Sequence, residues 1–217
     1  MMKTYENQTR IDSRVIISQM LTIIRNLIDK RDSFTSGHSA RVAACAHEIA
    51  RHMGLDDGFL ENLFYIGLLH DVGKVIVPNE IINKPAKLTD DEYAIMKKHT
   101  SVGKELLEDV TFIRNLTAGA SEHHERWDGK GYGQGISGED ISLEARIIAV
   151  ADTYDAMSED RPYRKALPKE VIIEEFTRCS GAQFDPQIIP IITDLIERDY
   201  FKSFDMDTLV NAYNHHD

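Results

Sequence analysis

Apolar residues recur at intervals of three and four positions along most of the chain, which is the spacing of one face of an α-helix. The alternation of apolar and polar residues that is typical of a half-buried strand is almost absent. The pattern predicts helices over 12–29, 39–53, 57–69, 112–123 and 143–157. The last of these is apolar nearly all round, as in a helix at the centre of a bundle. The fold is therefore predicted to be an all-α helical bundle.

Residues with capping roles mark the ends of further predicted helices. Thr89 and Glu92 form a capping box, in which the side chain of each accepts a hydrogen bond from the backbone of the other. On the helix that starts there, one stripe consists of Ile95, His99, Val102 and Leu106, so His99 is expected to face inward. Pro168 suits the first turn of a later helix, and Asp185 followed by Pro186 is expected to start the next.

Composition and charge narrow the classes of function. With 217 residues, of which 42% are hydrophobic, the chain is long enough for one domain with a sizeable core. A formal net charge of −11 disfavours binding to a nucleic-acid polymer or to anionic lipid. Cys45 and Cys179 lack the spacing of a disulfide framework or a thiolate metal site, and no segment is apolar enough to cross a membrane. We therefore expect a cytoplasmic protein that binds any nucleotide as a small molecule.

The chain contains nine histidines, and several of them lie next to or between carboxylates on different predicted helices. This set consists of His38, His70, Asp71, His99, His123, His124 and Asp152. Each has a plainer interpretation when taken alone, such as a hydrogen-bonded histidine of the core. Together, imidazole and carboxylate groups suit iron, manganese, zinc, nickel or cobalt, so they predict a catalytic metal site. His47, His52, His215 and His216 are placed on polar faces or in the tail and receive no role.

The order of these residues resembles the HD superfamily of metal-dependent phosphohydrolases, and within it the HD-GYP phosphodiesterases that hydrolyse cyclic di-GMP. The resemblance covers roughly residues 30–190. The matching stretches are 37–42 (GHSARV), 70–74 (HDVGK), 123–132 (HHERWDGKGY), 150–156 (VADTYDA), 160–164 (DRPYR) and 181–186 (GAQFDP). It implies an HD-GYP-like domain over 31–217, preceded by an N-terminal helix within 1–30.

By matching position, the resemblance implies two divalent metal ions, with iron or manganese as the first expectation. One would be held by His38, His70, Asp71 and Asp152, and the other by Asp71, His99, His123 and His124. Asp71 would bridge them. Two such ions about 3.5 to 4 Å apart share a hydroxide and neutralise a phosphodiester as its charge builds.

The same resemblance assigns residues to catalysis and to the substrate. Lys74 would act with Asp71 in catalysis by donating to a nonbridging phosphate oxygen, and Arg161 and Arg164 would hold phosphate or guanine. Tyr132 would stack on a base, although packing within its glycine-rich loop is an equally open interpretation. Asp155 is expected to support the ligands without binding metal itself.

Two positions depart from the family pattern. Some family members carry a glutamate where this chain has Phe34, and those members bind a third metal, so the two-metal pattern applies here. The family's Gly-Tyr-Pro reads Gly131-Tyr132-Gly133, which replaces a residue of fixed φ by the most permissive one. We expect metal binding to survive and the loop to be less ordered.

The leading hypothesis is a phosphodiesterase that hydrolyses cyclic di-GMP to pGpG, and optionally on to GMP, by in-line attack of a metal-bridging hydroxide. A diguanylate cyclase or another signalling protein is the expected protein partner. One alternative is an HD phosphohydrolase that acts on another nucleotide, such as cyclic GMP-AMP or a mononucleotide phosphate. The other alternative is a catalytically silent module that binds a nucleotide and signals through its shape.

Overall fold

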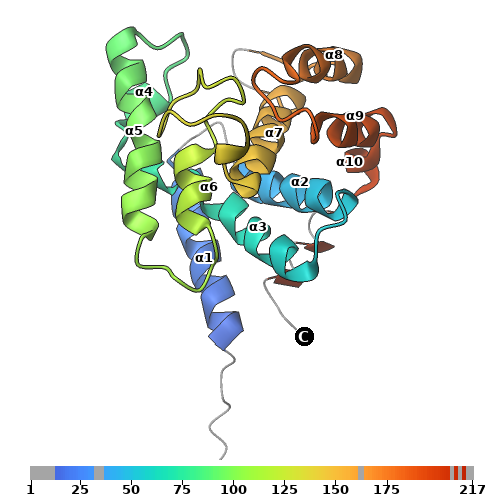
Figure 1. The fold of residues 1–217 in the computed structure, drawn as a ribbon. Coiled ribbons are helices and arrows are strands. Elements are labelled where there is room, and N and C mark those ends of the chain that lie inside the picture. The colour runs from blue at the N-terminus through green and yellow to red at the C-terminus, as the bar shows by residue number, and fades with distance from the viewer. Residues whose placement is uncertain (1–12, 32–36, 161–163, 206–207, 210–211, 214–217) are drawn as a thin grey trace, which may run out of the picture.

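The computed structural model of the chain describes residues 13–31, 37–160, 164–205, 208–209 and 212–213. Its described residues form a helical bundle with no strand, so the predicted fold class is confirmed (Figure 1). The longer helices are α1 (Ser13–Asp29), α2 (His38–His52), α3 (Asp57–Leu69), α5 (Asp90–Leu107), α6 (Leu116–Glu122), α7 (Leu143–Ser158), α8 (Lys169–Cys179) and α9 (Ile189–Glu197). The short ones are η1 (Val72–Ile76), α4 (Asn79–Ile82), η2 (Gly138–Asp140) and α10 (Tyr200–Ser203).

Most predicted helices lie within one or two residues of their expected ends. The capping box of α5 is present, because Glu92 N–H donates to Thr89 Oγ1 at 3.3 Å and Thr89 N–H donates to Glu92 Oε2 at 2.7 Å. The helix predicted from residue 112 begins later, at Leu116. Asn115 adopts a φ of 57°, which is incompatible with a continuous helix, and it leaves Phe112 61% exposed.

The hydrophobic core lies where α2 packs against α3 and α7. Phe64 of α3 and Ile147 of α7 are fully buried there. Gly67 explains the close approach of α2 and α3, since a Cβ at that position would lie 2.6 Å from the Cα of Ala43. This contact brings the start of α2 and the end of α3, which carry His38 and His70, to the same region of the bundle.

A second close contact joins η1 to α5. A Cβ on Gly73 would lie 1.9 Å from the carbonyl oxygen of His99, so only glycine allows the two backbones to approach this closely. The stripe predicted to face inward on α5 is buried only in part, because Leu106 is 50% exposed whereas His99 is 1% exposed. The glycine therefore sets His99 directly over the segment that follows Asp71.

The N-terminal helix α1 packs against α3 and η1. Its end is fixed by Arg31, whose Nη1 donates to the carbonyl oxygen of Val75 at 2.5 Å and whose Nη2 donates to that of Val77 at 2.8 Å. Asp29 accepts a hydrogen bond of 2.9 Å from Ser39 Oγ, next to His38. The domain boundary predicted near residue 30 stays a prediction. None of the described helices combines the length and the apolar composition that a membrane span requires.

Candidate metal centre

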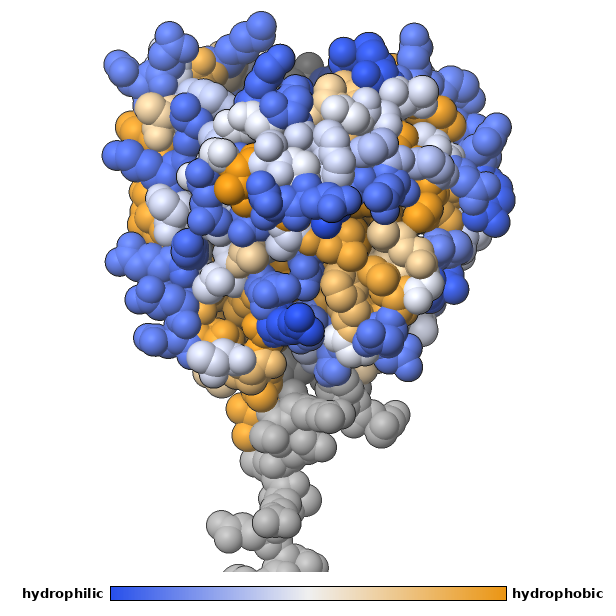
Figure 2. Space-filling view, viewed as in Figure 1, coloured by the Kyte–Doolittle hydropathy of each residue, from blue (hydrophilic) through white to orange (hydrophobic). Residues whose placement is uncertain are grey.

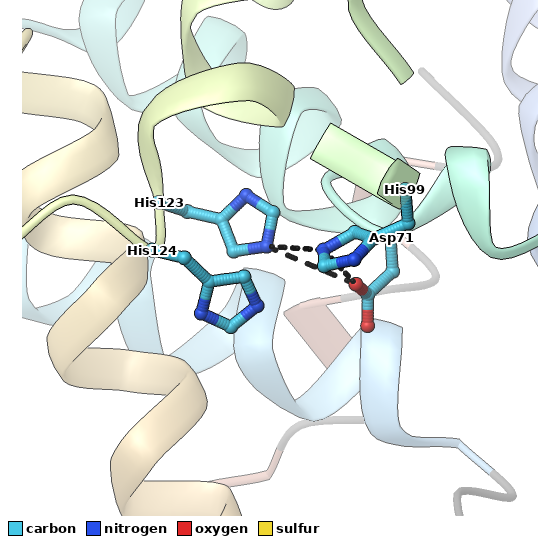
Figure 3. A group of neighbouring side chains, drawn as sticks. All are labelled: Asp71, His99, His123 and His124. Atoms are coloured by element: carbon cyan, nitrogen blue, oxygen red, sulfur yellow. Dashed lines mark hydrogen bonds and ion pairs between the residues drawn. The ribbon is translucent and has the colours of Figure 1, made fainter. Parts of the chain in front are cut away.

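The predicted ligands converge from five helical elements onto Asp71, which lies between α3 and η1. His99 of α5, His123 and His124 at the end of α6, and Asp71 form one group of donors (Figure 3). His38 of α2 and His70 at the end of α3 form a second group with the same aspartate. Within each group, the candidate ligand atoms lie within 4.8 Å of one another. Asp71 is thus the member that the two groups share.

The two carboxylate oxygens of Asp71 face different groups. Its Oδ1 lies 3.5 Å from His99 Nε2 and 3.8 Å from His123 Nε2. Its Oδ2 lies 3.3 Å from His70 Nε2 and 3.8 Å from His38 Nε2. Asp152 of α7 joins the second group, since its Oδ1 lies 3.3 Å from His38 Nε2. Each oxygen of one carboxylate can therefore serve a separate cation.

Three of the histidines are oriented by backbone carbonyl groups of their own helices. The Nδ1 atoms of His70, His99 and His123 lie 2.7, 2.7 and 3.0 Å from the carbonyl oxygens of Gly67, Met96 and Gly119, respectively. A carbonyl oxygen only accepts, so each Nδ1 carries the proton and each Nε2 presents a lone pair to the cluster. Metal-ligating histidines have this arrangement, in which the outer nitrogen is held and the inner one is free.

His38 is oriented instead by a carboxylate. Its Nδ1 lies 2.7 Å from Asp155 Oδ2, and Asp155 in turn accepts from Arg41 Nε at 2.5 Å. Burial alone would lower the pKa of His38, but Asp152 and Asp155 outweigh it and raise that pKa to about 10. This end of the cluster therefore favours a positive charge beside the two carboxylates. Asp155 contacts His38 as expected, and Arg41 is a supporting residue to which the sequence pattern gave no role.

The cluster fits a metal because, without one, two of its nitrogen lone pairs face each other and two of its buried atoms have no hydrogen-bond partner. His99 Nε2 and His123 Nε2 lie 3.4 Å apart, and the carbonyl contacts on the other side make both of them lone-pair donors. Burial lowers the pKa of both rings, so they stay neutral near pH 7. Among the buried atoms described, Asp71 Oδ1 and His70 Nε2 make no hydrogen bond. A cation would replace this repulsion and these missing bonds by coordination.

Lys74 is the cation that lies against the shared carboxylate. Its Nζ lies 2.6 Å from Asp71 Oδ2, one turn further along the chain. Burial alone would raise the pKa of Asp71, but Lys74, His70 and His99 hold it well below its usual value. Asp71 is therefore a carboxylate at neutral pH, as a ligand must be.

A cavity of about 340 Å³ opens beside the cluster. Its wall includes His123, His124, Asp152, Tyr132 and Lys130. The ring of Tyr132 stacks on that of His124, with a centroid distance of 4.8 Å and an interplanar angle of 26°. Tyr132 therefore lines the cavity while packing on His124, and its stacking on a base stays a prediction.

The loop that carries Tyr132 follows a hydrogen-bonded path, and its lower order relative to the family's loop stays a prediction. Glu125 is buried, and its Oε1 accepts from the backbone N–H groups of Gln134 and Gly135, the latter at 2.7 Å. Gly133 has a φ of 137°, and a Cβ there would lie 2.4 Å from the carbonyl oxygen of Ser121. The positive φ and the missing space for a Cβ both favour glycine at this position, and proline, whose φ is fixed and negative, cannot follow this path.

The remaining predicted residues lie apart from the cluster or outside the description. Arg164 donates to the backbone carbonyl oxygens of Met157 and Ala156 at 3.3 and 2.5 Å, so it caps the end of α7. Its binding to substrate stays a prediction. Arg161 and Phe34 lie outside the described residues. His47 was predicted to lie on a polar face, and this was wrong: it is 7% exposed and its Nδ1 lies 2.8 Å from Glu48 Oε1.

The comparisons with known proteins agree on one family. The family model described as "HD domain" matches residues 22–188. A cyclic di-GMP phosphodiesterase of Thermotoga maritima is 36% identical over 203 residues, which are 91% of this chain and 55% of the relative. A 3'3'-cGAMP-specific phosphodiesterase 2 of Vibrio cholerae is 35% identical over 196 residues, covering 88% of this chain and 37% of the relative.

The fold has a counterpart among solved structures. The crystal structure of a cyclic GMP-AMP specific phosphodiesterase of Vibrio cholerae (V-cGAP3) aligns with a TM-score of 0.70 at 19% identity, covering 91% of this chain and 53% of that one. At this identity the likeness concerns the fold. The chain spans about half the length, or less, of the relatives it matches.

Proposed function

The chain belongs to the HD domain family, and from this membership we propose that it is a metal-dependent phosphodiesterase that hydrolyses a cyclic dinucleotide. Cyclic di-GMP is the first candidate substrate, with linear pGpG as the product and GMP as the product of a second cleavage. The observation that supports the proposal best is the position of Asp71, whose two oxygens face separate groups of histidines.

Two divalent cations, with iron or manganese as the first expectation, would be held by these groups. His38, His70, Asp71 and Asp152 would hold one, and Asp71, His99, His123 and His124 the other. When bound, such a pair lowers the pKa of water and offsets the charge that builds on a phosphodiester. Four of these rings, those of His38, His70, His99 and His123, already have their outer nitrogen held by a carbonyl group or by Asp155, which suits them to this task.

Residues around the cluster would bind and orient the substrate. Lys74, whose Nζ lies 2.6 Å from Asp71 Oδ2, would donate to a nonbridging phosphate oxygen, a contact that strengthens as negative charge develops there. Tyr132 offers a ring face to a base, and Lys130 adds a positive charge to the same cavity. Arg161 and Arg164 stay predicted contacts to phosphate or guanine. A cytoplasmic location and a diguanylate cyclase as protein partner likewise stay predictions.

A second candidate substrate is 3'3'-cGAMP. This alternative is supported by the 3'3'-cGAMP-specific relative of Vibrio cholerae, because its identity of 35% is close to the 36% of the cyclic di-GMP enzyme. The two substrates differ only in one base, so contacts to the edge of that base would decide between them, because stacking on Tyr132 accepts either base.

One experiment tests the substrate. The chain is purified without oxygen, its metal content is measured by elemental analysis, and it is incubated with cyclic di-GMP, 3'3'-cGAMP and a mononucleotide phosphate. We expect chromatography to show a linear dinucleotide from cyclic di-GMP, and none with the Asp71→Ala variant. Faster turnover of 3'3'-cGAMP would favour the second candidate. Tight binding of cyclic di-GMP by metal-loaded protein, with no product, would instead identify a silent binding module.

A further inference from the structure

Helix α1 has a second apolar face that the rest of the described chain leaves exposed. Its inner face is buried against the bundle, with Leu21 6% and Ile28 9% exposed. The outer face consists of Ile16, Met20, Ile23 and Leu27, whose exposed fractions are 43%, 58%, 59% and 62%. The apolar residues of α1 thus form two separate faces. We call the outer four residues the α1 seam.

The spacing of the α1 seam is that of a coiled coil. Its residues follow one another at intervals of four, three and four positions, which is the heptad repeat of a and d positions that a second helix fills. A helix that only covers a globular core needs a single stripe, and α1 already has one. The seam therefore has the pattern for a partner helix, and the bundle does not supply it among its described residues.

The positions that flank the seam carry no charge that would oppose an identical helix as this partner. In the heptad defined by Met20 and Ile23, the flanking positions are occupied by Ile17, Gln19, Ile24 and Asn26, none of which is charged. The whole chain carries a net charge of −11, so two copies repel each other over most of their surfaces. Along the α1 seam and its flanking positions, two copies would meet without placing like charges opposite each other.

The position of α1 also leaves the seam accessible. The N-terminal end of α1 projects beyond the other helices (Figure 1), and hydrophobic surface is visible where it leaves the bundle (Figure 2). At its other end, the bonds of Arg31 to the backbone around Val75 and the contact of Asp29 with Ser39 hold the helix on the bundle. A second copy could therefore dock against α1 without displacing it from its own core.

We propose that α1 pairs with α1 of a second copy of this chain through the α1 seam. Two heptads bury less surface than the roughly 1,200–2,000 Å² of a stable interface, so the dimer is weak and dissociates on dilution. The proposal concerns assembly alone and does not depend on the proposed function.

Sedimentation equilibrium of the whole chain over a broad concentration series tests the proposal. We expect the mass to rise from the 24.7 kDa of one copy towards twice that value as concentration increases. The double variant M20E/I23E should stay monomeric throughout, because it places four carboxylates in the seam of the pair. As a matched control, L106E/F112E introduces the same charges at residues that are 50% and 61% exposed elsewhere, and it should dimerise like the unmodified chain.

A cross-linking measurement gives an independent readout. Cys45 and Cys179 are buried, so a cysteine introduced by Ile23→Cys is the accessible one among the described residues. Under mild oxidation it should form a disulfide-linked dimer much faster than the control Phe112→Cys, and circular dichroism should show that all variants keep their helices. A chain that stays monomeric at every concentration, a dimer that survives M20E/I23E, or equal cross-linking at both cysteines would overturn the proposal.

Discussion

Asp71 is the residue on which both groups of candidate ligands depend. Replacing it with alanine should remove both cations and reduce hydrolysis to background, because each of its oxygens faces one group. Elemental analysis and the nucleotide assay measure the two effects together. Asp71→Asn keeps the shape of the side chain and should fail in the same way, whereas Asp140→Ala on the exposed surface should change neither. Full metal occupancy in either Asp71 variant would contradict the shared role.

Lys74 should affect the reaction without affecting the ligands. We expect Lys74→Ala to keep its metal content and to lower kcat by about 100-fold, the usual effect of removing one donor to a developing charge. Lys84→Ala is the matched control, because Lys84 also pairs with a carboxylate at 2.6 Å, that of Glu92, but on the surface. A Lys74→Ala variant that loses its metal would show that the lysine supports the cluster instead.

At the scale of the loop, Gly133 stands where the family pattern has proline. We predict that putting proline back at this position does not improve turnover. Gly133→Pro should shift the loop, since the φ of 137° is closed to proline and the carbonyl of Ser121 occupies the space of a Cβ. We expect a several-fold rise in KM, because Tyr132 leaves its place on His124, with unchanged metal content. Gly135→Asn, at a φ of 76° with no atom within 4 Å of a Cβ, should have little effect. Improved turnover by Gly133→Pro would refute this path of the loop.

The ends of the helices could be predicted where a nearby residue fixes them. Asp56 caps α3 by accepting from the N–H of Phe59 at 3.0 Å, and α3 has the predicted bounds. Asn115 takes a positive φ, which asparagine only favours and does not require, so the start of α6 was placed too early. The helix η1 was missed because five residues are too short for a hydrophobic period.

Which histidines and aspartates would lie together could be predicted from the sequence, whereas the groups that orient them could not. The histidines and aspartates could be named because their order matches a family pattern. The carbonyls of Gly67, Met96 and Gly119 orient three of them through backbone atoms, which any residue would supply, so no sequence signal marks them. Arg164 was assigned to substrate from the same pattern, but its bonds to the end of α7 depend on a loop path that the sequence leaves open.

At the scale of the whole molecule, a buried polar network ties the C-terminal helix α10 to α2 and predicts how stability depends on pH. Burial alone would raise the pKa of Glu48, but hydrogen bonds from His47, Arg51 and Tyr200 lower it from 4.5 to about 2. A carboxyl whose pKa is lower in the folded state stabilises the protein above pH 4.5, and this contribution is lost as the pH falls towards 2.

Glu48→Gln should therefore lower the free energy of unfolding at pH 7 by about 2 kcal/mol, the typical value of hydrogen bonds to a charged group. Urea unfolding from pH 7 to pH 3 should show a smaller loss of stability for the variant than for the unmodified chain. Glu139→Gln, at an exposed position of η2, serves as the control and should leave the curve unchanged. Parallel curves for Glu48→Gln and the unmodified chain would argue against the lowered pKa.

The attachment of Arg31 has a mechanical consequence. Its guanidinium holds the carbonyl groups of Val75 and Val77, and Val75 is the residue directly after Lys74. The far end of α1 stands clear of the other helices (Figure 1). Through Arg31 the end of α1 is bonded to the backbone that follows Lys74, and α1 also packs on η1, so the position of this helix and that of the lysine's segment are tied together.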